Sequence, residues 1–137
     1  MKQALFIVFA VLAAAQGDHA LRVSVKGIKG GSGTVYVAVY RDSASFLADG
    51  KAFQTASGPA AEGASFTFDK LPAGTYAVSA FLDENGNGKL DKNFLGMPTE
   101  PWGVSNNPKR GMRAPHFDEA SFEYDGGGKN IEIELKK

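Results

Sequence analysis

The segment Thr34-Val35-Tyr36-Val37-Ala38-Val39-Tyr40 decides the fold class of this chain. β-Branched and aromatic residues, which favour extended backbone, occupy six of its seven positions. Because side chains alternate along a strand, the three valines lie on one face and the two tyrosines lie with Ala38 on the other. Apolar residues on both faces predict a central strand that is covered on both sides.

Shorter segments with the same period surround this strand. Residues 21–26 alternate Leu, Val and Val with polar residues, and the glycine-rich turn at 30–33 predicts that they form a hairpin with the central strand. Residues 64–68 continue the alternation. Leu71-Pro72-Ala73-Gly74 predicts a turn into a further strand at 75–82, in which Tyr76 is expected to pack at the corner.

The last strands follow the same pattern. Residues 122–124 and 131–135 are joined by Asp125-Gly126-Gly127-Gly128 and predict a second hairpin. No long stretch with a 3.6-residue period follows residue 15. The sequence therefore predicts an all-β, antiparallel β-sandwich of about seven strands, and the absence of repeats and linkers predicts a single domain over residues 16–137.

The first 15 residues are typical of a signal peptide. Met1-Lys2-Gln3 carries one positive charge, and residues 4–15 form an unbroken apolar run. That run is shorter than the ~20 residues that span a bilayer, and Ala13 and Ala15 fit a small-residue cleavage site. We expect a periplasmic or secreted protein with no transmembrane segment after cleavage. A buried helix, an N-terminal anchor and cleavage after Gly17 remain alternatives.

The cysteine count and the net charge limit the covalent modifications and the binding partners that this chain can have. The chain has no cysteine, which excludes disulfides and a lipid-modified N-terminal cysteine. It has 15 basic and 15 acidic residues, so losing Lys2 leaves 14 against 15, a net charge of −1. This balance argues against nucleic acid, whose binding needs a strongly basic face.

The run Asp83-Glu84-Asn85-Gly86-Asn87-Gly88-Lys89-Leu90-Asp91 resembles the first nine residues of a calcium loop. Oxygen-bearing side chains alternate along it, the sixth residue is a glycine that permits a sharp turn, and the seventh, Lys89, would contribute its backbone carbonyl. The twelfth position holds Phe94 in place of the usual Glu, so the last ligand is expected to be water or another acid, with Glu100 favoured over Glu84, Asp118 and Glu119. The predicted calcium ligands are Asp83, Asn85, Asn87, Lys89, Asp91 and Glu100.

A solvated turn rich in Asp, Asn and Gly is the alternative interpretation of this run. With two committed carboxylates, a calcium affinity near 10⁻⁴–10⁻³ M is expected, which suits a structural clamp. The loop as a whole, residues 83–117, is too long to be structureless, and its large apolar residues predict a small apolar cluster of its own. These residues are Leu90, Phe94, Leu95, Met97, Trp102, Val104, Met112 and Phe117.

Residues 102–110 are a candidate ligand surface. An aromatic ring beside amides and an arginine suits sugars or acidic peptides, and the candidate residues are Trp102, Asn106, Asn107 and Arg110. Alternatively, Trp102 packs under the loop while the two asparagines bond its backbone. Lys109, Arg110 and Arg113 are expected at a solvated edge, with a binding role as the alternative.

The sequence predicts no enzyme. A nucleophilic triad needs Ser or Cys with a His and an acid, and the only histidines are His19 and His116. Ser105 and His116 share the long loop near Asp118 and define an envelope hydrolase as the alternative. No catalytic residue is predicted otherwise.

Four motifs together resemble a bacterial family of small secreted domains of unknown function. They are the Leu71–Val78 and Asp83–Asp91 stretches, Asn93-Phe94-Leu95-Gly96-Met97-Pro98-Thr99-Glu100, and Gly103-Val104-Ser105-Asn106-Asn107. The resemblance implies an immunoglobulin-like or transthyretin-like sandwich, similar to carboxypeptidase-regulatory-like domains, with one calcium-loop insertion. The loop is similar to structural loops of bacterial surface-adhesin repeats. The resemblance implies export and supplies no activity.

We therefore expect an exported, non-enzymatic β-sandwich with a structural calcium site, which serves as a binding or accessory domain of the cell envelope. Its expected partner is a protein or a carbohydrate. A purely structural subunit that assembles through an edge strand at residues 131–135 is a further alternative.

Overall fold

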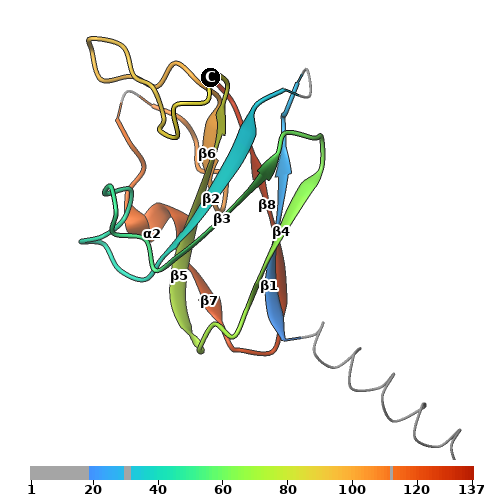
Figure 1. Ribbon diagram of the computed structural model, residues 1–137. Coiled ribbons are helices and arrows are strands. Elements are labelled where there is room, and N and C mark those ends of the chain that lie inside the picture. The colour runs from blue at the N-terminus through green and yellow to red at the C-terminus, as the bar shows by residue number, and fades with distance from the viewer. Residues whose placement is uncertain (1–18, 30–31, 112) are drawn as a thin grey trace, which may run out of the picture.

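The computed structural model describes residues 19–29, 32–111 and 113–137, so the predicted signal peptide at 1–15 lies outside the described residues. The described chain folds into two layers of strands with one short helix beside them (Figure 1). The elements are β1 (Ala20–Lys26), β2 (Thr34–Tyr40), β3 (Gln54–Pro59), β4 (Ala64–Asp69), β5 (Gly74–Asp83), β6 (Trp102–Val104), α2 (Phe117–Ala120), β7 (Phe122–Tyr124) and β8 (Lys129–Glu134).

The two layers are separate sheets. One sheet has the strand order β3-β2-β5-β6, and β7 pairs with the other end of β5. The second sheet has the order β4-β1-β8. All strand pairs are antiparallel except β1 and β8, which lie parallel with Val23 opposite Ile131. The predicted β-sandwich is confirmed.

Both predicted hairpins are wrong. β1 and β2 lie in different sheets, and β1 pairs with β4 and β8. β7 pairs with β5, while β8 pairs with β1. In each case the glycine-rich turn carries the chain from one layer to the other. Gly33 has a φ of 103°, and a Cβ there would lie 2.5 Å from the carbonyl oxygen of Asp83, so the crossing requires a residue without a side chain.

The core lies between the sheets. Val35, Val37 and Val39 of β2 are fully buried in it, as the alternation predicts. The other face of β2 is the outer face of the sheet, where Tyr36 is half-buried and stacks on Phe81 with centroids 5.3 Å apart. The prediction that β2 is covered on both sides holds only at its end, where Tyr40 is buried against Phe46 with ring centroids 5.4 Å apart. No second sheet covers the rest of this face among the described elements.

The predicted corner at Tyr76 is confirmed. Its ring is buried in the core, and its hydroxyl donates a hydrogen bond of 2.6 Å to the carbonyl oxygen of Pro72. Alternate residues of β5 face the same way and are buried, namely Tyr76, Val78, Ala80 and Leu82. The turn thereby fixes the start of β5. The other end of β5 is Asp83, where the long loop begins.

Candidate binding cleft and candidate cation loop

The long loop after β5 has two parts. The first projects from the end of the sandwich where the C-terminus lies, and the second returns through β6 to α2 (Figure 1). Val104 and Ala120 are buried in a small cluster with Ala77, against which Trp102 and Phe117 pack. The predicted apolar cluster is confirmed for these loop residues, while Met112 lies outside the described residues.

Two residues do not join this cluster. Phe94 is 95% exposed and Leu95 is 71% exposed, so the prediction that they are buried is wrong. The physical reason is local. The Asn93 side chain accepts hydrogen bonds from the backbone N–H groups of Leu95 and Met97, which closes a tight turn that directs the two apolar residues away from the sandwich.

Asp83 organises the start of the loop. Its side chain is buried, and its Oδ1 and Oδ2 accept the backbone N–H groups of Gly86 at 3.0 Å and Gly88 at 2.7 Å. Both glycines have a φ of 78°, so each supplies left-handed backbone that other residues rarely adopt. The sharp turn predicted at Gly88 is present.

Three further side chains of the predicted cation loop meet one another. The Nδ2 groups of Asn85 and Asn87 each lie 2.5 Å from an oxygen of the Asp91 carboxylate. The amide oxygens accept backbone N–H groups two residues ahead, so Lys89 contributes its N–H to Asn87 while its ammonium is exposed. These hydrogen bonds close the turn.

Glu100 holds the two ends of the loop together. It is buried, and its Oε2 and Oε1 accept the backbone N–H groups of Glu84 at 2.7 Å and Asp91 at 2.9 Å. Among residues 19–29, 32–111 and 113–137, no group of three or more His, Cys, Asp or Glu side chains is arranged to hold a metal ion. The predicted ligands thus lie on one closed loop, in which the carboxylates of Asp83 and Glu100 bond to backbone N–H groups.

Ser105 is a structural hydroxyl. It is buried, its Oγ accepts the N–H of Val78 at 2.9 Å, and it donates to the carbonyl oxygen of Ala120 at 2.5 Å. His116 is exposed at the start of α2. The hydrolase alternative requires a hydrogen bond between Ser105 and His116. The described structure does not form it, because the serine hydroxyl is already bonded to backbone groups of β5 and α2.

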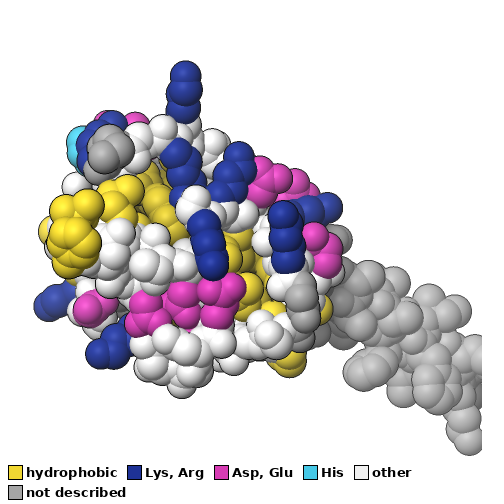
Figure 2. All heavy atoms as spheres, turned by 90° about the horizontal axis from the view of Figure 1, so that it is seen from above, with side chains coloured by type: hydrophobic (Ala, Val, Ile, Leu, Met, Phe, Trp, Pro, Cys, Tyr) yellow, Lys and Arg dark blue, Asp and Glu magenta, His cyan; other side chains and the backbone are white. Residues whose placement is uncertain are grey.

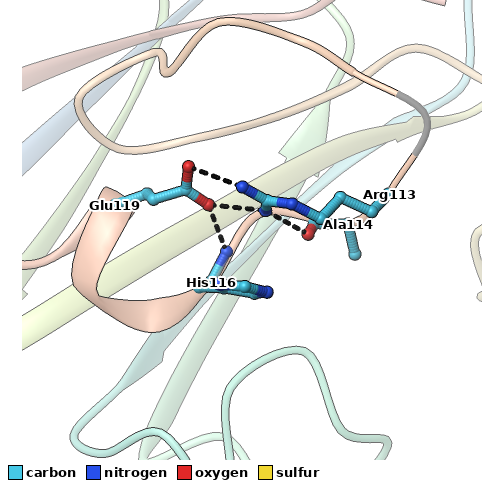
Figure 3. A network of polar contacts seen from close by, with 4 residues as sticks. All are labelled: Arg113, Ala114, His116 and Glu119. Atoms are coloured by element: carbon cyan, nitrogen blue, oxygen red, sulfur yellow. Dashed lines mark hydrogen bonds and ion pairs between the residues drawn. The ribbon is translucent and has the colours of Figure 1, made fainter.

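A polar network fixes the approach to α2 (Figure 3). Arg113 forms two hydrogen bonds to the Glu119 carboxylate, at 2.8 and 3.1 Å, and also bonds the carbonyl oxygen of Ala114. Glu119 accepts the backbone N–H of His116 at 2.7 Å. The hydrogen bond from Arg113 and that from the His116 backbone lower the pKa of Glu119 from its ordinary 4.5 to about 2.

A cleft of about 210 Å³ opens beside β6. It is lined by Trp102, Asn107 and Arg110 from the predicted ligand surface, and by Lys109, Arg113 and Lys136. Asn106 is not a lining residue, because its amide bonds the carbonyl oxygens of Glu119 and Ser121. The sequence pattern did not indicate Lys136, which reaches the cleft only because β8 lies beside β6.

Arg110 covers the indole of Trp102. Its guanidinium carbon lies 3.9 Å from the ring centroid, and its Nη2 donates to the Trp102 carbonyl oxygen. Loss of water around the guanidinium lowers its pKa from the ordinary value. Lys109, Arg110 and Arg113 are exposed, as expected of a solvated edge, and all three also line the cleft.

The charges in the cleft are unbalanced. Arg113 pairs with Glu119 at 2.8 Å, and Lys136 pairs with Glu134 at 3.3 Å. Lys109 and Arg110 have no ion-pair partner in the part of the chain that the structure describes. Two cations without carboxylate partners beside an aromatic ring favour an anionic group in the cleft.

Asn107 caps the outer edge of β8. Its Nδ2 donates to the carbonyl oxygen of Glu132 at 3.0 Å, and its Oδ1 accepts the N–H of Glu134 at 2.9 Å. Further along, the backbones of Trp102 and Lys136 exchange two hydrogen bonds of 3.0 Å. The Glu132 carbonyl and the Glu134 N–H of the predicted assembly edge at residues 131–135 therefore already have partners, while assembly through this edge stays a prediction.

Comparison with known proteins places the chain in a family. Residues 23–132 match the family described as "Uncharacterized protein conserved in bacteria (DUF2141)", and the chain belongs to that family. No curated protein and no solved structure matches the chain. Within the described residues, no helix is long and apolar enough to cross a membrane.

Proposed function

We propose that this protein is an exported, non-enzymatic β-sandwich module of the bacterial cell envelope that binds an anionic ligand in the cleft beside β6. One observation supports this function above the others. Arg110 lies on the indole of Trp102 without a carboxylate partner among the described residues, at the wall of a cleft large enough for one small group. A guanidinium held in this way offers paired N–H donors to a carboxylate or phosphate.

The arrangement suits binding more than catalysis. Ser105, the candidate nucleophile, is buried and bonded to backbone groups of β5 and α2. The cleft instead is lined by β6 and by the Arg113–Glu119 ion pair (Figure 3). A preorganised cationic surface reduces the entropy lost on binding.

Fluorescence of Trp102 tests this function, because Trp102 is the only tryptophan in the sequence. Titration with glucuronate should change its emission saturably, whereas glucose should not, since the two sugars differ in the carboxylate. A short oligoglutamate separates acidic peptides from acidic sugars. Arg110→Gln should weaken binding by about tenfold or more, which corresponds to loss of a charge-assisted hydrogen bond.

Lys51→Gln is the matched control, because it removes an exposed positive charge that does not line the cleft. Equal binding by Arg110→Gln and wild type, or no saturable response to any anion, would refute the proposed function. A response in which the neutral sugar matches the acid would assign the cleft to neutral carbohydrate instead.

The loop at 83–100 is the second part of the proposal. We propose that calcium binds there as a structural clamp, with Asp83, Asn85, Asn87, Asp91 and Glu100 as side-chain ligands and Lys89 as a backbone carbonyl ligand. The chemistry of the donors supports it, since these groups supply only oxygen once the asparagine amides present their oxygen atoms. Carboxylate oxygens that accept one hydrogen bond retain a lone pair for a cation.

Thermal unfolding in excess chelator and then in millimolar calcium tests the clamp. At a calcium concentration ten times the Kd, the stability should rise by about 1.4 kcal/mol. Asp83→Ala combined with Asp91→Ala should abolish the increase, whereas Glu84→Ala, an exposed acid outside the ligand set, should preserve it. An unchanged melting temperature would leave the loop as a hydrogen-bonded polar turn.

The last part of the proposal is that the protein is exported through a cleaved signal peptide and that its sandwich is transthyretin-like. Cleavage after Ala15 is tested by the mass of the protein recovered from the periplasm or medium of an expressing bacterium, and an intact N-terminus would contradict it. The transthyretin-like assignment is supported by the Leu71–Tyr76 turn, in which the Tyr76 hydroxyl bonds Pro72.

A further inference from the structure

The turn at residues 93–97 presents two adjacent large apolar side chains to solvent. Phe94 is 95% exposed and Leu95 is 71% exposed, and in the described part of the chain Leu47, at 36%, is the one other exposed large hydrophobic residue. Single exposed apolar residues are ordinary on protein surfaces. A neighbouring pair at the tip of a projecting loop is a candidate interaction site.

The backbone of this turn is hydrogen-bonded within itself. Asn93 Oδ1 accepts the N–H groups of Leu95 at 2.9 Å and Met97 at 3.1 Å. The Asn93 backbone bonds Gly96 at 2.9 Å and Met97 at 2.8 Å. Because these polar groups already have partners, the turn can leave water at a lower cost than an open loop.

Two lysines lie close to the turn in the sequence. Lys89 and Lys92 are exposed and form no ion pair with any residue that the structure describes. The neighbouring acids are engaged, since Asp91 accepts from two asparagine amides and Glu84 pairs with Lys137 at 3.5 Å. Two unpaired lysines beside an apolar tip complement an anionic surface.

The space-filling view agrees with this arrangement. Figure 2 looks down on the end of the molecule from which the loop projects. Hydrophobic side chains protrude at the left margin of this face, and Lys or Arg side chains lie close to them, beside a band of acidic side chains (Figure 2). The loop that carries the turn projects from this end of the sandwich, and Phe94 and Leu95 are exposed, so a flat surface can reach them (Figure 1).

We propose that the turn at 93–97 docks this protein on an anionic lipid surface. Phe94 and Leu95 enter the boundary between headgroups and acyl chains, and Lys89 and Lys92 contact the headgroups. Two side chains on a protruding turn suit a lipid interface, which has no fixed shape, whereas a protein partner would need a pocket fitted to them. The docking turn does not line the cleft, so it is independent of the proposed anion site.

Vesicle sedimentation tests the proposal with the protein recovered after export. Wild-type protein should sediment with vesicles of equal parts phosphatidylglycerol and phosphatidylcholine, and more weakly with pure phosphatidylcholine. Phe94→Ser with Leu95→Ser should reduce binding about tenfold or more on both compositions. Lys89→Gln with Lys92→Gln should reduce it about tenfold on the anionic vesicles only, and added salt should reproduce that loss.

Leu47→Ser is the matched control, since it removes an exposed leucine from a different loop and should leave sedimentation unchanged. All variants share one N-terminus, so any contribution of residues 1–15 cancels in the comparison. Equal sedimentation by wild type and the Phe94/Leu95 variant would overturn the proposal, as would wild type that stays in solution with anionic vesicles. Wild-type binding to a protein-coated surface but not to bare lipid would assign the tip to a protein pocket and would also overturn it.

Discussion

The rings of Tyr76 and Tyr124 pack edge to face, with centroids 6.3 Å apart and planes at 69°. Their hydroxyl groups differ. The Tyr76 hydroxyl donates to the carbonyl oxygen of Pro72 at 2.6 Å, whereas the Tyr124 hydroxyl is buried with no hydrogen-bond partner among the described residues. A buried donor without a partner keeps its desolvation cost, so the two phenols contribute to stability with opposite signs.

Replacing each tyrosine by phenylalanine should therefore give opposite results. Tyr76→Phe should lower the free energy of unfolding by about 1 kcal/mol, and Tyr124→Phe should raise it by a similar amount. Urea unfolding of the two variants and wild type measures both. A Tyr124→Phe variant as destabilised as Tyr76→Phe would mean that the Tyr124 hydroxyl has a partner after all.

The approach of β6 to β8 requires glycine at position 103. A Cβ on Gly103 would lie 2.6 Å from the carbonyl oxygen of Glu134 and 2.9 Å from Cγ2 of Ile133. Gly103→Ala should therefore destabilise the fold by about 1–3 kcal/mol, because both neighbours belong to a paired strand and move little. Gly111→Ala is the control, since among the described residues, its chain neighbours aside, no heavy atom lies within 4 Å of the added Cβ. Equal stability of both variants would show that β8 shifts freely.

Ser105→Ala separates a structural hydroxyl from a nucleophile. Without Oγ, the N–H of Val78 and the carbonyl oxygen of Ala120 lose a buried partner, so stability should fall by about 1–3 kcal/mol. Ser65→Ala, on an exposed position of β4, should change stability by less than about 0.5 kcal/mol. Thermal unfolding compares them. If Ser105→Ala is as stable as wild type, the buried hydroxyl does not stabilise the fold, and the hydrolase alternative should be tested again.

Acid should release α2 from Arg113. The folded pKa of Glu119 is depressed to about 2 from an ordinary 4.5, so its contribution to stability is complete above pH 4.5 and declines as the pH falls toward 2. The Glu119 side-chain carbon should titrate with a midpoint near 2 by NMR. Glu119→Gln should remove the part of the stability change that falls between pH 4.5 and 2, and a titration midpoint near 4.5 would contradict the ion pair.

Local patterns in the sequence predicted most strands correctly, because alternation and turn residues are local signals. The β2 valines, the buried face of β5 and the Tyr76 corner follow from such patterns. Which strands pair is a long-range property. The turns at 27–33 and 125–128 are rich in glycine as hairpin turns are, yet both connect different sheets, and the parallel pairing of β1 with β8 has no local signature.

The candidate sites show the same limit. Trp102, Asn107 and Arg110 are close in sequence, and the structure brings all three to one cleft. Lys136 joins them only through the contact of β6 with β8. Ser105 and His116 are also close in sequence, but burial of the serine hydroxyl between β5 and α2 depends on packing that the sequence pattern does not reveal. Phe94 and Leu95 are apolar, so the sequence pattern predicts that they are buried. Their exposure depends on the geometry of the turn, which the pattern does not indicate.

The parallel pairing of β1 and β8 has a mechanical consequence. β1 begins at the end of the sandwich from which β8 starts, and the two strands run side by side in register. A force that pulls the start of β1 and the end of β8 apart therefore acts along the strands and loads all their hydrogen bonds at once. An antiparallel pair pulled at neighbouring ends would break its bonds one after another. The domain pulled through these two strands should accordingly resist stretching, and single-molecule force spectroscopy can measure that resistance.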